Sequence, residues 1–166
     1  MSEIKNYILD QAVAEKKLRR MALQIIENNP NEELLILAGI RESGSVVARY
    51  IQKAIAQISN VKTELITITL DKKKPEGVEL SKSIDFNNQV VIVVDDVADS
   101  GRTLLYALKP FLNFHPRKIQ TLVLVQRSHN SFPVTPDYVG VSIATTLQEQ
   151  IYVEVDEERV TGAYLK

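Results

Sequence analysis

The chain has 166 residues, of which 45% are hydrophobic, so it is of single-domain size and can supply one substantial core. Its formal net charge of −1 provides no overall attraction to nucleic acid or to an anionic membrane. The absence of cysteine excludes disulfides and thiolate metal sites and suits a reducing compartment. Neither a signal-peptide pattern nor an apolar stretch of membrane-spanning length occurs, so we expect a cytoplasmic protein that makes no membrane contact.

Hydrophobic periodicity alternates between the helical and the extended repeat along the chain, with no internal repeat and no linker. Leu18, Met21 and Ile25 recur at helical spacing, whereas Leu34–Ile40 is an apolar run of strand length. This alternation predicts a single α/β unit with a mainly parallel sheet. The predicted elements are helix Gln11–Asn28, strand Leu34–Ile40, a helix over residues 46–58, strand Glu64–Leu70, strand Val90–Val94, a helix from Arg102 to about Leu112, and strands Ile119–Val125, Tyr138–Ile143 and Ile151–Val155.

The segment Asp71–Asn88 is polar, contains three consecutive lysines at 72–74, and follows neither period. A loop of this length inside a compact domain is usually either an active-site lid or disordered. A lid would bring lysines to an anionic ligand and exclude water, whereas a solvated charge run would have the same composition. The sequence leaves these two interpretations open.

The run Val90–Val94 is apolar and β-branched, which predicts a central strand covered on both faces. Asp95 and Asp96 follow at its carboxyl end, where open α/β sheets bind their ligands. The turn Ser100–Thr103 then offers backbone N–H groups and hydroxyls at the start of a helix, which favours an anion. A phosphate fits this turn, and the two carboxylates could hold the vicinal hydroxyls of a sugar directly or through Mg²⁺. The alternative is a strand-end turn with a Ser cap and solvated acids.

This stretch resembles the phosphoribosyl-pyrophosphate (PRPP) motif of type I phosphoribosyltransferases, in which two acids follow a strand and precede a Thr/Ser-Gly-x-Thr turn. Leu34–Gly44 is similar to the strand and loop that receive pyrophosphate in that family. Leu122–His129 and Pro136–Gly140 are similar to the region beside the nucleobase. Over roughly residues 8–155 the chain resembles the bifunctional pyrimidine-operon attenuator and uracil phosphoribosyltransferase proteins.

The resemblance implies a mainly parallel sheet flanked by helices, with a small hood built from both ends of the chain. The domain would be single, residues 1–166, with a flexible hood loop at about 71–88, and the family commonly forms homodimers. The implied activity is Mg²⁺-dependent transfer of the phosphoribosyl group of PRPP to a nucleobase, giving a nucleoside monophosphate. The implied sites are Asp95, Asp96, Ser100, Gly101, Arg102 and Thr103 for PRPP, Asp95 and Asp96 for Mg²⁺, Arg41, Glu42, Ser43 and Gly44 for pyrophosphate, and Gln126, Arg127, Tyr138 and Val139 for the base.

Several of these residues have plain structural alternatives. Arg41 could instead form a surface ion pair with Glu42, and a core tyrosine would give the same pattern as a base-stacking Tyr138. Asp99 departs from the uracil-converting relatives, which usually have an aromatic or other non-acidic residue at this place in the motif. The purine enzymes have an aspartate there that faces N7 of the base. An aspartate so placed could exchange a proton with a purine as the catalytic acid or base, or could be an exposed turn residue. Gln126 stands where those purine enzymes have a lysine, and it brings no charge.

An alternative function is a regulator that senses PRPP or a nucleotide and binds RNA from pyrimidine genes. Four basic residues, Lys16, Lys17, Arg19 and Arg20, would form a cationic helix face able to meet phosphates. The histidine expected on this helix in the attenuator relatives is absent, with Leu23 near its place, and their basic segment appears here as Ala144–Gln148. RNA binding is therefore the weaker hypothesis.

Overall fold

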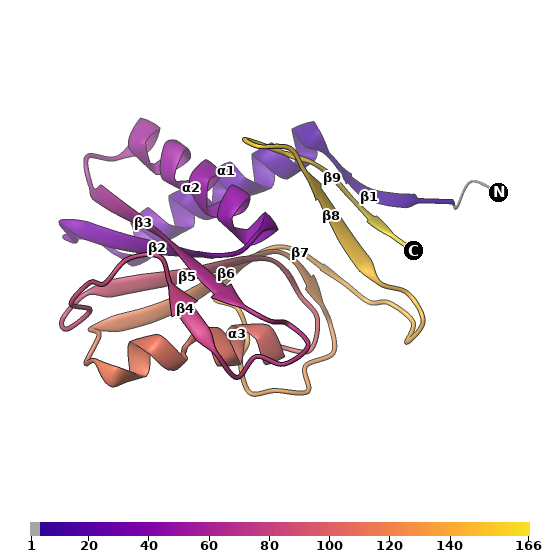
Figure 1. Cartoon of the computed structure of the whole chain (residues 1–166). Helices are drawn as coiled ribbons and strands as arrows, with labels where there is room; N and C mark the ends of the chain where they lie inside the picture. Colours follow the sequence, from indigo (N-terminus) through magenta and orange to yellow (C-terminus); the bar gives the residue numbers. More distant parts are fainter. Residues whose placement is uncertain (1–3) are drawn as a thin grey trace.

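A computed structural model describes residues 4–166 as two sheets and their covering helices (Figure 1). The larger sheet has six strands in the order β4-β3-β2-β5-β6-β7, and the smaller has three in the order β1-β9-β8. The elements are β1 (Asn6–Asp10), α1 (Gln11–Asn28), β2 (Leu34–Ile40), α2 (Ser43–Ile58), β3 (Lys62–Leu70), β4 (Val78–Leu80), β5 (Val90–Ala98), α3 (Arg102–Ala107), the 3₁₀ helix η1 (Lys109–Asn113), β6 (Lys118–Arg127), β7 (Tyr138–Ile143), β8 (Ile151–Val155) and β9 (Val160–Leu165).

The larger sheet is parallel from β3 to β7, and only the edge strand β4 is antiparallel. Its centre is in register across three strands, with Ala38 beside Val93 and Val93 beside Thr121. Helices α1 and α2 pack on one face, and α3 with η1 packs on the other (Figure 1). The predicted α/β architecture with a mainly parallel sheet is confirmed. Since both faces are covered, β2 is apolar throughout and β5 is apolar from Val90 to Val94.

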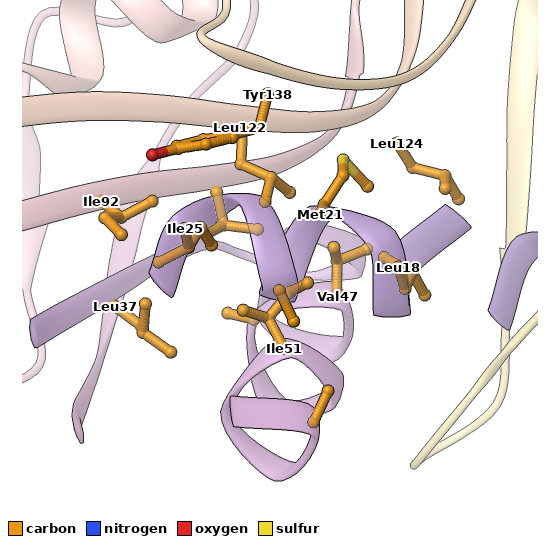
Figure 2. Packing of buried hydrophobic residues seen from close by; sticks show 14 of the residues in the cluster. Leu18, Met21, Ile25, Leu37, Val47, Ile51, Ile92, Leu122, Leu124 and Tyr138 are labelled. Carbon is orange, nitrogen blue, oxygen red and sulfur yellow. The ribbon is translucent and has the colours of Figure 1, made fainter. Parts of the chain in front are cut away.

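Helix α1 begins where its sequence supplies a cap, because the Asp10 carboxylate accepts a hydrogen bond of 2.8 Å from Val13 N. Its buried stripe, which includes Leu18, Met21 and Ile25, packs against α2 and the sheet. Figure 2 shows this layer, with Val47 and Ile51 of α2 among the same side chains. Burial of this stripe fixes α1 across the sheet, as its periodicity predicts.

The hood is the three-stranded antiparallel sheet, in which the last strand β9 lies between β1 and β8. It therefore joins both ends of the chain, as the family resemblance implies (Figure 1). Its short strands β1 and β9 show no clear repeat, and no prediction from periodicity included them. Along residues 4–166, no helix has the length and apolar character needed to cross a membrane.

Three predicted segments differ from the structure. The helix expected over 102–112 ends at Ala107 and continues as the 3₁₀ helix η1, because Pro110 has no N–H to donate and its ring disfavours the α-helical turn. The strand expected over 90–94 continues to Ala98, so Asp95 and Asp96 lie within it. The loop expected over 71–88 contains β4 and the buried Phe86, whose ring packs edge-on against Phe111 at 4.9 Å.

Candidate active site

Asp95 and Asp96 lie near the carboxyl end of β5, at the edge of the sheet where the parallel strands end. Asp95 is 1% exposed, and its Oδ1 accepts a 2.9 Å hydrogen bond from the backbone N–H of Asp96. Its Oδ2 has no hydrogen-bond partner. Burial, followed by the nearby Asp96 carboxylate, raises the pKa of Asp95 well above its usual range, while Lys72 acts in the opposite direction. A cation bound at this carboxylate would remove the cost of keeping it charged.

Lys72 already brings a positive charge to both carboxylates. Its Nζ lies 3.7 Å from Asp95 Oδ1 and 3.9 Å from Asp96 Oδ1. The next residue is held as well, because Arg102 Nη2 donates a 3.3 Å hydrogen bond to the Lys73 carbonyl. The segment after β3 therefore lies over the turn that follows β5. The lysine run suggested contact with an anionic ligand, but nothing in the sequence indicated that Lys72 would reach the two acids.

The turn Ser100–Thr103 opens α3 and lines a cavity of about 360 Å³ together with Lys72, Asp96, Asp99 and Ile151. Gly101 has φ of 86°, a conformation that favours glycine. A Cβ at Gly101 would also lie 3.1 Å from the Val134 carbonyl. The Ser100 hydroxyl accepts a 3.3 Å hydrogen bond from Arg102 N and so caps the turn. The turn is therefore tight at Gly101 and opens directly into α3 beside the cavity.

The loop after β2 packs directly on Asp95 through Gly44. A Cβ built on Gly44 would lie 2.8 Å from the Val94 carbonyl and 3.1 Å from Asp95 Oδ1. The proposed pyrophosphate loop is therefore adjacent to the carboxylates, with Ser43 half-buried. Arg41 and Glu42 are exposed, are joined by a cis peptide bond, and form no ion pair with each other. The structure therefore does not contain the surface ion pair with Glu42 that was the alternative for Arg41.

Asp99 and Arg127 meet at the ends of neighbouring strands. Arg127 Nη1 lies 3.0 Å from Asp99 Oδ1, and its Nη2 donates a 2.5 Å hydrogen bond to the Thr146 carbonyl. Asp99 is 68% exposed in its side chain and lines the cavity, whereas Arg127 is only 12% exposed. Gln126 is half-buried beside them, paired with Ala98 across the two strands. The structure therefore brings these three sequence-predicted residues together at the strand ends, with Asp99 lining the cavity.

Tyr138 and Val139 do not lie at this site, which corrects the expectation that they contact a base. Tyr138 begins β7 beside Leu122, four residues before Ser142, which pairs with Gln126 at the strand end. At about 3.3 Å per residue this is roughly 13 Å from the edge. Its ring is 2% exposed, its hydroxyl donates a 2.9 Å hydrogen bond to Gln120, and it packs under α1 (Figure 2). The Val139 carbonyl accepts a hydrogen bond from Arg20 of α1.

Three buried side-chain polar atoms in the described chain have no hydrogen-bond partner: Asp95 Oδ2, Arg127 Nε and Thr145 Oγ1. All three belong to the carboxyl edge of the sheet or to the segment that follows β7. Buried polar groups are nearly always paired in folded proteins, and exceptions indicate a missing ligand, ion or water. The clustering supports a binding site here. Thr145 carried no sequence signal for such a site.

The carboxylates suit a magnesium ion that is shared with a substrate. No group of three or more acidic or histidine side chains within residues 4–166 could hold a metal alone. Mg²⁺ usually takes one or two carboxylates and completes its shell with water and substrate phosphate oxygens. The unpartnered Asp95 Oδ2, next to Asp96, fits that pattern.

The sequence profile described as "Phosphoribosyl transferase domain" matches residues 6–158. Curated relatives named "Bifunctional protein PyrR" match almost end to end. The protein of Macrococcus caseolyticus is 34% identical over 98% of this chain and 99% of its own, and that of Clostridium novyi is 36% identical over 93% of each. The protein of Staphylococcus saprophyticus is 38% identical over 90% of this chain and 91% of its own.

Solved structures with the same fold are more distant in sequence. A hypoxanthine-guanine phosphoribosyltransferase from Bacillus anthracis superposes with a TM-score of 0.75 at 23% identity, over 98% of this chain and 97% of that one. The hypoxanthine phosphoribosyltransferase of Trypanosoma cruzi superposes with a TM-score of 0.78 at 16% identity, over 96% of this chain and 95% of that one. At these identities the similarity establishes the fold.

Proposed function

The chain belongs to the phosphoribosyltransferase family, and we propose that it transfers the phosphoribosyl group of PRPP to a nucleobase. The observation that carries this proposal is the buried carboxylate of Asp95, which lies beside Asp96 on a central strand and has an unpartnered Oδ2. The glycine turn that opens α3 follows within six residues. The two acids suit the ribose hydroxyls, and the backbone of Ser100–Thr103 suits the 5′-phosphate.

In this reaction the bond from ribose C1 to pyrophosphate breaks, pyrophosphate leaves with the electron pair, and a base nitrogen bonds to C1 as it loses its proton. Mg²⁺ bound at Asp95 and Asp96 would withdraw negative charge from the leaving group. Arg41 and the backbone of Glu42–Gly44 would hold pyrophosphate, since this loop packs on Asp95. Lys72, which lies on the carboxylates here, would approach the same anion and help exclude water.

The acceptor base is proposed to be uracil or a 6-oxopurine. The similarity to attenuator and uracil phosphoribosyltransferase proteins supports uracil, and the named relatives extend over most of the chain. Asp99 supports a purine, because it lines the cavity and could exchange a proton at N7. Gln126 and Arg127 remain the proposed base-side residues. The nearby His129 is exposed and has no role in this proposal.

RNA binding is a second candidate function, favoured by the word "bifunctional" in the names of those relatives. In this chain the basic face of α1 is only partly available to phosphates. Arg20 donates hydrogen bonds to the Val139 and Gly140 carbonyls, and Arg19 interacts with the Tyr50 hydroxyl. We therefore expect weak, strongly salt-dependent association at most. A cytoplasmic location, expected from the composition and the lack of a signal-peptide pattern, stays a prediction. A homodimeric state, expected from the family resemblance, also stays a prediction.

The proposed transfer is tested by incubating the protein with PRPP, Mg²⁺ and one base at a time from a panel of uracil, hypoxanthine, guanine, xanthine and adenine. Pyrophosphate and nucleoside monophosphate are measured together, because hydrolysis of PRPP would release the first without the second. We expect equal amounts of both products with uracil or a 6-oxopurine. PRPP binding with no product from any base would instead support the sensing and RNA-binding function.

A further inference from the structure

Arg127 is the last residue of β6, and its guanidinium contacts two other parts of the chain at once. One nitrogen lies 3.0 Å from Asp99, which follows the last residue of β5. A second nitrogen donates to the Thr146 carbonyl, in the segment between β7 and β8. The side chain therefore joins two strand ends of the main sheet to the segment that leads into the hood.

The segment over residues 144–150 connects β7 to β8 of the hood. It contains no helix or strand, and Thr146 N donates a 2.8 Å hydrogen bond to Glu149 within the same segment. Gln150 exchanges backbone hydrogen bonds with Lys166 at the hood. The next residue, Ile151, begins β8 and lines the cavity together with Asp99. A contact that fixes Thr146 therefore also constrains the wall of the cavity that Ile151 forms.

We propose that Arg127 is a positioning residue, which holds Asp99 and the 144–150 segment in place on the base side of the cavity. Arg127 Nη1 bonds to one oxygen of the exposed Asp99 carboxylate, and this charge-assisted contact restricts how the carboxylate is oriented toward a base. The role rests on the proposed transferase function. It predicts that changes at Arg127 alter the handling of the base and leave PRPP largely unaffected, since the Arg127 guanidinium bonds to Asp99 and Thr146 and not to Asp95, Asp96 or the Ser100–Thr103 turn.

A lysine could not replace this arginine. Arg127 uses two nitrogens in a planar fork to reach a carboxylate and a carbonyl in different segments, whereas the lysine ammonium is a single point charge on a flexible stem. Arg127→Lys would keep a positive charge near Asp99 but lose the fixed link to Thr146. This difference separates a positioning role from simple charge neutralisation.

The experiment compares the parent protein with Arg127→Met, Arg127→Lys and Arg20→Met, measuring separate KM values for the base and for PRPP. Arg20→Met is the matched control, because Arg20 also bridges to backbone carbonyls, at Val139 and Gly140, but on the α1 side of the sheet. For Arg127→Met we expect the base KM to rise roughly 10-fold or more, the usual effect of losing a hydrogen bond to a charged group. The PRPP KM should stay within about two-fold. Arg127→Lys keeps the charge near Asp99 but not the link to Thr146, so its base KM should also rise.

A second readout does not depend on turnover. Amide hydrogen exchange over residues 144–150 should become about 10-fold faster in Arg127→Met and stay unchanged in Arg20→Met. If the parent transfers no phosphoribosyl group, the proposed function fails while this exchange still decides whether the link exists. Unchanged exchange in Arg127→Met, or equal rises in the base and PRPP KM values, would overturn the positioning role.

Discussion

The guanidinium of Arg127 lies 3.0 Å from the Asp99 carboxylate, and this contact joins the ends of the neighbouring strands β6 and β5. Asp99 is nevertheless 68% exposed and faces a cavity that also contains Asp96 and Thr103. It is therefore held in place while remaining open to a ligand. A carboxylate held in this way has a restricted position beside the place where the sugar-phosphate would put a base.

Replacing Asp99 by asparagine tests this acid–base role. Asp99→Asn removes the charge and keeps the shape, so PRPP affinity should be nearly unchanged, because the carboxylates and the phosphate turn are intact. Turnover of purine bases should fall by roughly 10²- to 10⁴-fold, and any uracil turnover should be almost unaffected. The exposed Asp85→Asn serves as the control in steady-state assays. Full purine turnover in Asp99→Asn would make Asp99 a turn residue and favour uracil as the acceptor.

The buried carboxylate of Asp95 should make the unliganded protein less stable as pH rises. Burial raises its pKa in the folded state, so the folded chain holds this proton more tightly than the unfolded chain does. The stabilisation that this proton provides is complete below the unfolded-state pKa of about 3.9. It is lost as pH rises through the higher folded-state pKa. Asp95→Asn should therefore melt higher than the parent by about 3 °C or more at pH 8, with a smaller difference at pH 5.

The comparison needs thermal melts without ligand and a second set with Mg²⁺ and PRPP. Asp96→Asn is the comparison variant: it removes the neighbouring charge but not the buried one, so it should raise the melting temperature by less than Asp95→Asn does. With ligand present the order should reverse, since only the parent gains stability from binding. A melting-temperature difference between parent and Asp95→Asn that is the same at every pH would contradict the conclusion that the charged Asp95 carboxylate destabilises the unliganded protein.

Gly44 should tolerate no side chain, because a Cβ there would lie 2.8 Å from the Val94 carbonyl and 3.0 Å from Asp95 Cα. Gly44→Ala must push the start of α2 away from β5, at a cost of roughly 1–3 kcal/mol in unfolding free energy. It should also weaken PRPP binding. Gly77→Ala is the matched control, since no atom lies within 4 Å of its added Cβ. Denaturant unfolding and calorimetry measure both effects, and equal behaviour of the two variants would refute the close packing.

Tyr138 should matter for stability and not for the base. Its hydroxyl donates to Gln120 and lies 3.5 Å from Asn29 Nδ2 inside the core. Tyr138→Phe should lower the free energy of unfolding by about 1 kcal/mol, the usual value for one buried hydrogen bond. The KM for the base should not change. A rise in that KM with unchanged stability would return Tyr138 to the base site.

Sequence periodicity predicted the elements that bury a continuous face, such as α1, β2 and β5, because burial itself imposes the apolar pattern. It did not identify β4, which has three residues, or the hood strands β1 and β9, whose short patterns are mixed. The helix after Thr103 was predicted too long because Pro110 was not weighed against the apolar repeat. Periodicity therefore predicted an element where that element buries a continuous face, and it failed where the element is short or its pattern is mixed.

In the candidate site as well, the sequence indicated residues that are close together along the chain but not residues that come from separate segments. Asp95, Asp96 and the turn Ser100–Thr103 lie close together in sequence, and their strand-to-helix context predicted that they would lie close together in the fold. Lys72, Thr145 and Ile151 come from other segments, and only the folded chain brings Lys72 and Ile151 to the cavity. Tyr138 was placed wrongly because a core tyrosine and a base-stacking tyrosine have the same sequence pattern. Its position, several residues before the end of β7, decided between them.

The most direct measurement is calorimetric titration of PRPP into the parent protein and into the double variant Asp95→Asn/Asp96→Asn, each with and without Mg²⁺. We expect the parent to bind PRPP more tightly when Mg²⁺ is present. The double variant should bind at least about 10-fold more weakly and show no response to Mg²⁺, because both carboxylate ligands are lost. Its circular dichroism should match the parent, which confirms that the fold is kept. Equal PRPP affinity in the two proteins would contradict the assignment of this strand end as the ribose-phosphate site.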